Sequence, residues 1–592
     1  MLNLAAARKV RQGKLPHVPP TASPLGTQVE LVLDVPDTAI PEAFITDTRR
    51  SLAWRTGMTY DPVRRVWTAP LLLPTQPTVL TYHFILANGT RIQERRQAEG
   101  VIKPLFGEWE EKDFRIAAYD LQGVPPAWVR GQVLYQIFPD RFAVGDPASL
   151  HKKGQAEKVY GLDPIYKGWD EKPEHPPQSR DFFGGDLRGV INKLDYLHTL
   201  GVTCIYFTPI FESPSNHRYD ALDYFKIDPR LGNEEDLREL VREAHKRGVR
   251  VMLDLVLNHC SSESAMFKSA QQAKTSSWYR MFEFHDWPHY DGWLKVKSMP
   301  EFVECPEMED FFFGPNGVAQ YWLKTGIAGF RTDVTPWITE ACWRRFFKAL
   351  RAVKPNVYLI AEDWGDNTSR FTGDQFDASM NYRFGYTVLV WANGHLNPSE
   401  LDDRLETIRR DYAPPFLHAQ MNLLGSHDTA RLLTMCNGDT TRLKMAVALL
   451  LGYPGVPMIF AGDEAGCEGD YAEAARVPFP WDTPNTELIQ FYRTALHARR
   501  NSAALSTGDV ETVWINDDHR SYGFKRIFEQ DSAYVFLNEG NIPSEVVVEH
   551  VTLGIWCDVL GSNAVVSVAQ DQVLRVTIPA KSGLWFTRQA AC

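Results

Sequence analysis

Three acidic residues in the middle of the chain each end an apolar segment that has the composition of a buried strand. They are Asp333, Glu362 and Asp428, and the segments are 329–334, 358–361 and 421–425. The carboxyl ends of parallel strands in a barrel meet at one mouth, so we expect the three carboxylates to converge there. Repulsion between them would raise at least one pKa, which a general acid working near neutral pH needs. Two carboxylates that flank a bond are the minimal set for glycoside hydrolysis.

Other polar residues occupy the ends of the same segments. Arg331 lies two residues before Asp333, so in a strand both side chains face the same side. Buried charges need partners, and this pair alone fits a structural ion pair as well as a catalytic one. What favours catalysis is that polar residues end four apolar runs in order along the chain. The other polar residues of this kind are Asp254 within the segment 249–257, Asn258 and His259 directly after it, and His427 beside Asp428.

Eight apolar segments alternate with amphipathic helices between residues 123 and 505. Leu237, Leu240 and Ala244, for example, recur at the spacing of one helix face. Strands that are apolar throughout and separated by helices indicate a parallel sheet, and eight of them predict a (β/α)8 TIM barrel. The segments are 133–138, 202–209, 249–257, 329–334, 358–361, 379–382, 421–425 and 456–461.

The chain on either side of this region has the pattern of all-β domains. Residues 25–122 contain alternating strands and the turn signal Asn88-Gly89, which predicts an N-terminal β-sandwich behind an extension of residues 1–24. Residues 506–592 show the same alternation and predict a C-terminal β-sandwich. Within the barrel, residues 260–299 form a long insertion rich in Trp, Phe and His, which we expect to build part of the site.

Composition and charge argue against several other classes of protein. The chain has 592 residues, of which 44% are hydrophobic and 23% charged, as in soluble proteins of several domains. Its net charge of −11 argues against a nucleic-acid partner. The sequence contains no uninterrupted apolar run of about 18 residues, so we do not expect a membrane span. The first 24 residues lack the apolar core of a secretory signal, so we expect a cytoplasmic location. The eight scattered cysteines are expected to be reduced thiols.

Four segments taken together resemble the signature regions of the α-amylase family of glycoside hydrolases. The N-terminal sandwich, Met299-Pro300 and Met380-Asn381-Tyr382 resemble the branch of cyclomaltodextrinase, neopullulanase, maltogenic amylase and maltodextrin glucosidase. The resemblance implies retaining hydrolysis of α-1,4-glucosidic bonds in maltodextrins, cyclodextrins or related α-glucans, with transglycosylation as a further outcome. A mainly 4-α-glucanotransferase activity and a non-catalytic glycan-binding or scaffold role are the alternatives. The four segments are Asp254–His259, Gly329–Asp333, Ala361–Trp364 and Gly425–Thr429.

The resemblance also implies roles for single residues at the barrel mouth. Asp333 would be the nucleophile, Glu362 the acid/base and Asp428 the transition-state stabiliser. Arg331, with Asp254 as a second partner, would hold Asp333 ionised, because an adjacent cation favours the charged form.

Four further residues would bind the sugar. His259 and His427 would bind hydroxyl groups, Tyr219 would stack under the ring, and Trp364 would line the leaving-group side. For Tyr219 and Trp364, plain core packing is the alternative.

The resemblance leaves little room for metal in the chemistry. Relatives usually carry Asn in a calcium-binding loop where this chain has Val144, which has no side-chain oxygen. Asp146, Gly184 and Asp186 remain, so we expect at most a structural calcium ion and no cofactor for catalysis. The implied partners are an α-glucan oligosaccharide and a second copy of the chain, bound through the N-terminal domain.

Overall fold

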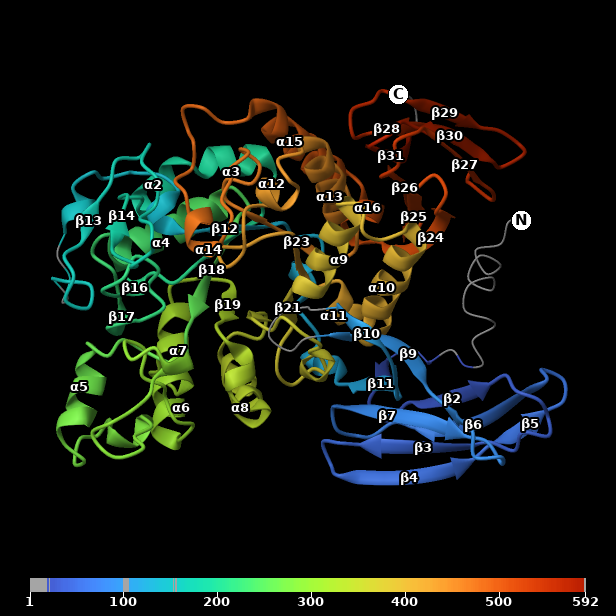
Figure 1. Ribbon diagram of the computed structural model, residues 1–592, viewed down its shortest axis with the longest axis horizontal. Helices are drawn as coiled ribbons and strands as arrows, with labels where there is room; N and C mark the ends of the chain where they lie inside the picture. Colours follow the sequence, from blue (N-terminus) through green and yellow to red (C-terminus); the bar gives the residue numbers. More distant parts are fainter. Residues whose placement is uncertain are drawn as a thin grey trace.

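A computed structural model describes residues 17, 19–20, 22–99, 106–152, 154 and 157–589 (Figure 1). The extension predicted over residues 1–24 lies mostly outside the described residues. Over the described ranges the chain forms a central barrel with an antiparallel β region on either side of it in sequence.

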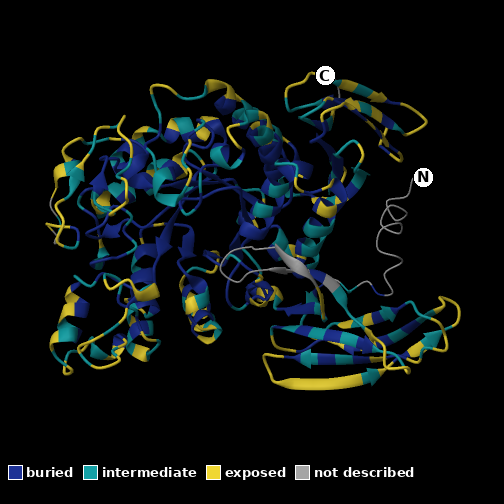
Figure 2. Ribbon diagram, viewed as in Figure 1, coloured by how far each residue is buried: buried dark blue, intermediate teal, exposed yellow. Residues whose placement is uncertain are grey.

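Eight parallel strands close into the predicted barrel. Leu134 of the first strand pairs with Cys204 of the second and with Met458 of the last, which completes the ring. Their residues are buried almost throughout, as a sheet covered by helices requires (Figure 2). All eight predicted segments are confirmed as strands. In barrel order they are β12 (Leu134–Ile137), β15 (Cys204–Phe207), β18 (Arg250–Leu255), β19 (Gly329–Thr332), β20 (Tyr358–Ala361), β21 (Ala378–Asn381), β22 (Met421–Leu423) and β23 (Val456–Phe460).

The helices around the barrel begin at polar caps. Asn233 accepts backbone N–H bonds at the start of α4, and Thr339 and Asp439 do so for α8 and α13. The apolar stripe Leu237, Leu240 and Ala244 of α4 is buried, as its spacing predicts. The helices of this region include α2 (Leu187–Asn192), α3 (Leu194–Leu200), α4 (Glu234–Lys246), α6 (Pro306–Phe313), α7 (Val318–Leu323), α8 (Glu340–Val353), α9 (Tyr382–Ala392), α10 (Pro398–Asp411), α13 (Thr440–Gly452), α15 (Thr486–Asn501) and α16 (Ala503–Thr507).

The N-terminal β region is a sandwich with a core of its own. One sheet has the order β1-β11-β7-β3-β4, with β8 beside β7, and the other has the order β2-β6-β5. Leu31, Leu80 and Phe84 are among the buried side chains between them. The strands are β1 (Ser23–Pro24), β2 (Gln28–Leu33), β3 (Glu42–Asp47), β4 (Leu52–Gly57), β5 (Thr59–Asp61), β6 (Val66–Leu72), β7 (Thr78–Ile85), β8 (Arg91–Ile92), β11 (Phe114–Tyr119) and the hairpin β9 (Glu94–Glu99) with β10 (Phe106–Lys112).

The C-terminal β region packs directly on the barrel helices. A sheet of order β24-β25-β26-β31-β28-β29 faces the pair β27-β30. Val535 and Trp585, on the side of the sheet that faces the barrel, belong to the same apolar core as the residues of α13. The strands are β24 (Asp509–Asn516), β25 (Ser521–Phe528), β26 (Asp531–Asn538), β27 (Ser544–Val548), β28 (Gly554–Asp558), β29 (Val565–Val568), β30 (Leu574–Ile578) and β31 (Ser582–Gln589).

Two long excursions leave the barrel on its catalytic side. The insertion predicted over residues 260–299 contains the helix α5 (Ala265–Gln272) and two short 3-10 turns. Sequence analysis did not predict the other, between β12 and α2, where β13 (Ile165–Tyr166) pairs with β14 (Asp181–Phe182).

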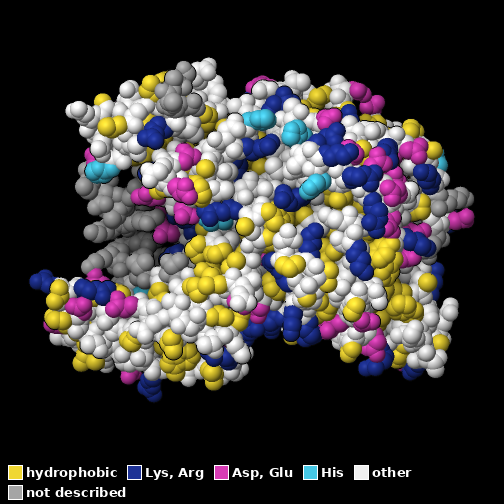
Figure 3. Space-filling model, turned by 180° about the vertical axis from the view of Figure 1, so that it is seen from behind, with side chains coloured by type: hydrophobic (Ala, Val, Ile, Leu, Met, Phe, Trp, Pro, Cys, Tyr) yellow, Lys and Arg dark blue, Asp and Glu magenta, His cyan; other side chains and the backbone are white. Residues whose placement is uncertain are grey.

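The surface and the cysteines complete the description. Acidic and basic side chains lie interspersed on the face seen in Figure 3. Among the described residues no helix is both long and apolar enough to cross a membrane. Within the part of the chain that the structure describes, six cysteines are free thiols, but Cys557 is disulfide-bonded, so the expectation that all eight are reduced is wrong at this position.

Candidate active site

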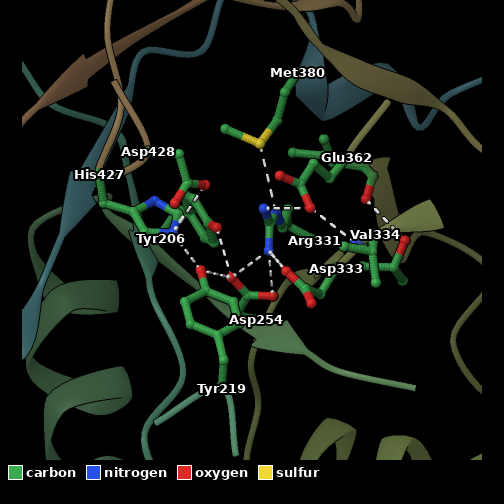
Figure 4. A network of polar contacts seen from close by, with 12 residues as sticks. Tyr206, Tyr219, Asp254, Arg331, Asp333, Val334, Glu362, Met380, His427 and Asp428 are labelled. Carbon is green, nitrogen blue, oxygen red and sulfur yellow. Dashed lines mark hydrogen bonds and ion pairs between the residues drawn. The ribbon is translucent and has the colours of Figure 1, made fainter. Parts of the chain in front are cut away.

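A single buried arginine joins three carboxylates at the mouth of the barrel (Figure 4). Arg331 Nη1 donates to Asp254 Oδ1 and Oδ2 at 2.9 and 2.8 Å and to Asp333 Oδ1 at 2.9 Å. Its Nη2 lies 3.0 Å from Glu362 Oε2. The arginine is fully buried on β19, between Asp254 on β18 and Glu362 after β20. The structure therefore brings together the arginine, its expected second partner and two of the three predicted catalytic acids.

The backbone after Asp333 is held in an uncommon conformation. Val334 has a φ of +37°, in the left-handed region that β-branched residues avoid. Its N–H donates to Glu362 Oε2 at 2.8 Å. Strain of this kind persists only where the surroundings impose it, and it is concentrated at functional sites. Here it fixes the loop after the nucleophile candidate against the acid/base candidate.

The carboxylates outnumber the cation that they share. Burial and the charge of Glu362 raise the pKa of Asp333 well above its usual range, although Arg331 acts in the opposite direction. Burial likewise raises the pKa of Asp254 to about 6 against the pull of Arg331. Both shifts favour the protonated form, and because the carboxyl groups interact, a proton that the cluster takes up belongs to them as a set. A protonated and an ionised carboxyl side by side are what an acid and a nucleophile require.

Tyr219 and His427 form a second layer beside these acids. Tyr219 donates its hydroxyl hydrogen to Asp254 Oδ2 at 3.0 Å, and its ring stacks on that of His427 at 5.4 Å. Gln136 Nε2 donates to His427 Nδ1 at 2.9 Å. Burial, reinforced by nearby arginines, lowers the pKa of His427 well below its usual value. His427 is thus a neutral imidazole whose Nε2–H points to the Tyr219 hydroxyl.

Trp364 contacts the acid/base candidate directly. Its Nε1–H donates to Glu362 Oε1 at 3.2 Å, and its ring lies flat on Tyr382 with 3.6 Å between centroids and 8° between planes. Trp364 is half-buried. Tyr382 was noted in the sequence only as part of a motif. Its position directly after the barrel strand β21 is a signal that could have placed it in the site.

His259 lies at the edge of the insertion and not within the network of Figure 4. Burial lowers its pKa to about 3, so the ring is neutral, and its buried Nε2 has no hydrogen-bond partner among the described residues. Trp293 stacks on it at 5.1 Å and also contacts the half-exposed Trp337 at 6.2 Å. An unpaired imidazole nitrogen beside aromatic rings suits a sugar hydroxyl. Trp293 and Trp337 were not predicted as site residues.

Asp428, the third predicted acid, is the most exposed of the three. Its Oδ1 accepts a 3.3 Å hydrogen bond from Arg476 Nη2, and Arg476 Nε donates to the carbonyl of His427 at 2.9 Å. Sequence analysis missed Arg476, because it lies in the loop after β23 with no motif around it.

The predicted calcium ligands are close together but do not form a calcium site. The carboxylate of Asp186 accepts N–H bonds from Gly145, Asp146 and Gly189 and caps α2. Asp146 Oδ2 lies 3.1 Å from the ammonium of Lys152, and the N–H of Gly184 donates to Asp140. Within the described ranges, no three His, Cys, Asp or Glu side chains could hold a metal together. The carboxylate oxygens of Asp146 and Asp186 are already bonded, mainly to nitrogen donors, so these side chains as they lie do not fit the ion.

Comparisons with known proteins agree with this geometry. The catalytic-domain model of alpha amylase matches residues 136–486. The chain is 37% identical to a cyclomaltodextrinase of Geobacillus thermopakistaniensis over 73% of its own length and 72% of the relative. It is 34% identical to an amylopullulanase of Thermoanaerobacter thermohydrosulfuricus over 82% of its length but spans only 38% of that protein. A solved cyclomaltodextrinase structure covers 97% of this chain at 28% identity, with a TM-score of 0.73 and 99% of its own length matched. The chain therefore belongs to the α-amylase family of glycoside hydrolases.

Proposed function

We propose that the protein is a retaining hydrolase of α-1,4-glucosidic bonds in maltodextrins, cyclodextrins or related α-glucans. The observation that carries the proposal is the contact of one arginine with Asp254, Asp333 and Glu362 at the mouth of an α-amylase-family barrel. The names of the similar cyclomaltodextrinases support short or cyclic α-glucans as the substrate class.

The proposed reaction has two displacements at the anomeric carbon. An Asp333 oxygen attacks this carbon while the bond to the leaving oxygen breaks, and Glu362 donates its proton to that oxygen. Glu362 then accepts a proton from water, whose oxygen attacks the same carbon and releases Asp333. Asp428 accepts hydrogen bonds from sugar hydroxyls during both steps. Arg331 balances the negative charge left on Asp333 and Glu362 in turn.

The remaining site residues are assigned to substrate binding. Tyr219, held flat by His427, offers a ring face to the sugar, and His259 offers its unpaired Nε2 to a hydroxyl. Trp364 lies beside the proton donor, on the leaving-group side. Transfer to a second sugar uses the same residues with the acceptor in place of water, so transglycosylation accompanies hydrolysis in this proposal.

The stereochemistry and the products of the first turnovers test the proposal. Double displacement predicts that proton NMR shows the α-anomer of the first product, whereas early β-anomer would contradict a covalent intermediate. Products from maltotriose, β-cyclodextrin, pullulan and soluble starch would define the substrate, and products longer than maltotriose would reveal transfer. If the protein cleaved none of the four substrates, the proposed activity would be refuted.

We further propose the division into a sandwich of residues 25–122, a barrel of residues 123–505 with the insertion 260–299, and a sandwich of residues 506–592. The exposed edge strand β4, with Leu52 and Trp54 partly in solvent, supports a homodimer through the N-terminal region. Sedimentation of the purified chain would test this. The cytoplasmic location stays a prediction, supported by the free thiols but not by the disulfide at Cys557.

A further inference from the structure

Five charged side chains meet where the N-terminal sandwich touches the barrel, and we name them the Arg115 cluster. They come from the sandwich, from the loop after β20, and from the adjoining ends of α9 and α10. The members are Arg96 on β9, Arg115 on β11, Asp366, Arg383 and Asp411.

The cluster is closely paired and mostly buried. Asp411 Oδ2 lies 2.5 Å from Arg96 Nη2 and 2.9 Å from Arg383 Nη2, and all three side chains are no more than 5% exposed. Arg115 bridges the two acids, with Nη1 2.5 Å from Asp366 Oδ2 and Nε 3.8 Å from Asp411 Oδ1. Buried charges of this kind fix orientation, because each is costly without its partners.

On the barrel side, two members of the cluster are close in sequence to the two stacked rings that lie beside the acid/base candidate. Asp366 lies two residues after Trp364, whose Nε1–H donates to Glu362. Arg383 directly follows Tyr382, on which Trp364 stacks at 3.6 Å. One cluster is therefore connected to both rings of the stack through short stretches of backbone, one from each charged residue.

Other contacts of the sandwich fall on the same loop. Arg115 Nη1 also donates to Thr368 Oγ1 at 3.3 Å, and the N–H of Asp120 donates to the carbonyl of Thr372 at 2.9 Å. Arg49 Nη2 pairs with Asp374 at 2.7 Å. The sandwich is thus attached to the segment that begins with the acid/base candidate.

We propose that Arg115 is a positioning residue for Glu362, acting through Asp366 and the Trp364–Tyr382 stack. The N-terminal sandwich then contributes to proton donation without touching substrate. This inference rests on the proposed function, in which Glu362 protonates the leaving oxygen.

A leaving group that needs no proton separates this role from general damage to the site. With maltotriose, the departing sugar oxygen takes a proton from Glu362. With α-maltosyl fluoride, Asp333 bonds to the anomeric carbon while the carbon–fluorine bond breaks and its electron pair leaves with fluoride. This leaving group needs no proton. The kcat/KM for the fluoride reports this first displacement alone, so it is insensitive to the position of the acid.

The experiment compares Arg115→Met with the wild type on both substrates. We expect kcat/KM to fall at least about tenfold for maltotriose and less than about twofold for α-maltosyl fluoride. Arg115→Lys should recover part of the loss, and Trp364→Phe, which keeps a ring but removes the N–H donor, should give the same split. Arg64→Met is the control, because Arg64 forms an exposed ion pair with Glu30 within the sandwich. It should change neither rate.

Equal losses on the two substrates, or no loss on maltotriose, would overturn the inference. If Arg115→Met does not fold, as judged by a thermal melt, Asp366→Asn removes the same pair from its more exposed side and must show the split. Arg49→Met breaks a pair in the same interface farther along the loop, and a split as large as that of Arg115→Met would also contradict a specific role. A wild type that cleaves neither substrate would instead refute the proposed function.

Discussion

The two sandwiches that flank the barrel are attached to it by different kinds of contact. The C-terminal sheet shares one apolar core with the barrel helices: a Cβ on Gly452 of α13 would lie 3.2 Å from Val535 Cγ2 and 3.3 Å from Trp585 Cζ2. The N-terminal sandwich has a core of its own, although Ala117 and Tyr119 of β11 join the barrel core, and it adds the charged contacts of the Arg115 cluster.

The difference separates stability from positioning. Apolar packing is strong but nondirectional, so the C-terminal sheet is expected to stabilise the outer helices without affecting the strand ends. Ion pairs contribute less net free energy but fix directions, and the cluster lies behind the acid/base loop. Substitutions at the first interface should therefore change stability, and those at the second should change catalysis.

Asp333→Asn sets the scale for a purely catalytic effect. It removes the proposed nucleophile and keeps the shape, so kcat should fall by about three orders of magnitude or more. The melting temperature should not fall, because a buried carboxyl of raised pKa is replaced by a neutral group. A variant that kept more than about a tenth of the wild-type rate would remove Asp333 from the mechanism.

Trp585→Ala tests the apolar interface. Trp585 is completely buried, so its loss should lower the free energy of unfolding by about 3–5 kcal/mol. Urea unfolding measures this change, while kcat/KM per folded molecule should stay within about twofold of the wild type. A large loss of kcat/KM in the folded variant would show that this interface also positions the site.

Acid should distinguish the two interfaces as well. Burial alone would raise the pKa of Asp411, but Arg115, Arg96 and Arg383 outweigh it and lower the pKa to about 2. A depressed carboxyl pKa stabilises the fold fully above the unfolded value near 3.9, and this contribution of about 2 kcal/mol is lost as pH falls toward 2.

Melts of the wild type and Asp411→Asn across pH would measure this term. The difference in stability between them should be constant from pH 7 to 5 and should shrink below about pH 4. The corresponding difference for Trp585→Ala should not depend on pH. A gap that already shrank between pH 7 and 5 would assign the effect to another group.

Local patterns were enough to predict the barrel and the positions of the candidate catalytic acids. A strand buried on both faces must be apolar throughout, so a charged residue at its end, as in Gly329–Asp333, stands out in the sequence. The three acids and Arg331 were predicted for this reason, and the structure places them at one mouth.

Contacts between remote segments could not be predicted in the same way. Arg96 and Asp411 are 315 residues apart, and their pairing depends on how the sandwich docks. Arg476 and Trp293 likewise lie in loops without periodic pattern, and their contacts with Asp428 and His259 arise only from the folded path of the chain. The small sheet between β12 and α2 was missed because its strands have two residues each.

The smallest effect is expected at the loop of Asp146 and Asp186, for which the family resemblance implied a structural calcium ion. If a calcium ion stabilised this loop, the stability of the barrel would depend on the ion as well as on the contacts with the two sandwiches. In this chain Asp186 caps α2, and Asp146 pairs with Lys152 at the surface, where solvent screens the ion pair and leaves it little effect on stability. Chelation with EDTA should therefore change the melting temperature by less than about 2 °C, and kcat/KM by less than about twofold. Lys152→Met should have a similarly small effect, whereas Asp186→Ala should cost about 1 kcal/mol through loss of the helix cap, with or without calcium. A melting temperature that fell several degrees on chelation and was restored by calcium would show that the nitrogen donors around Asp146 and Asp186 give way to the ion.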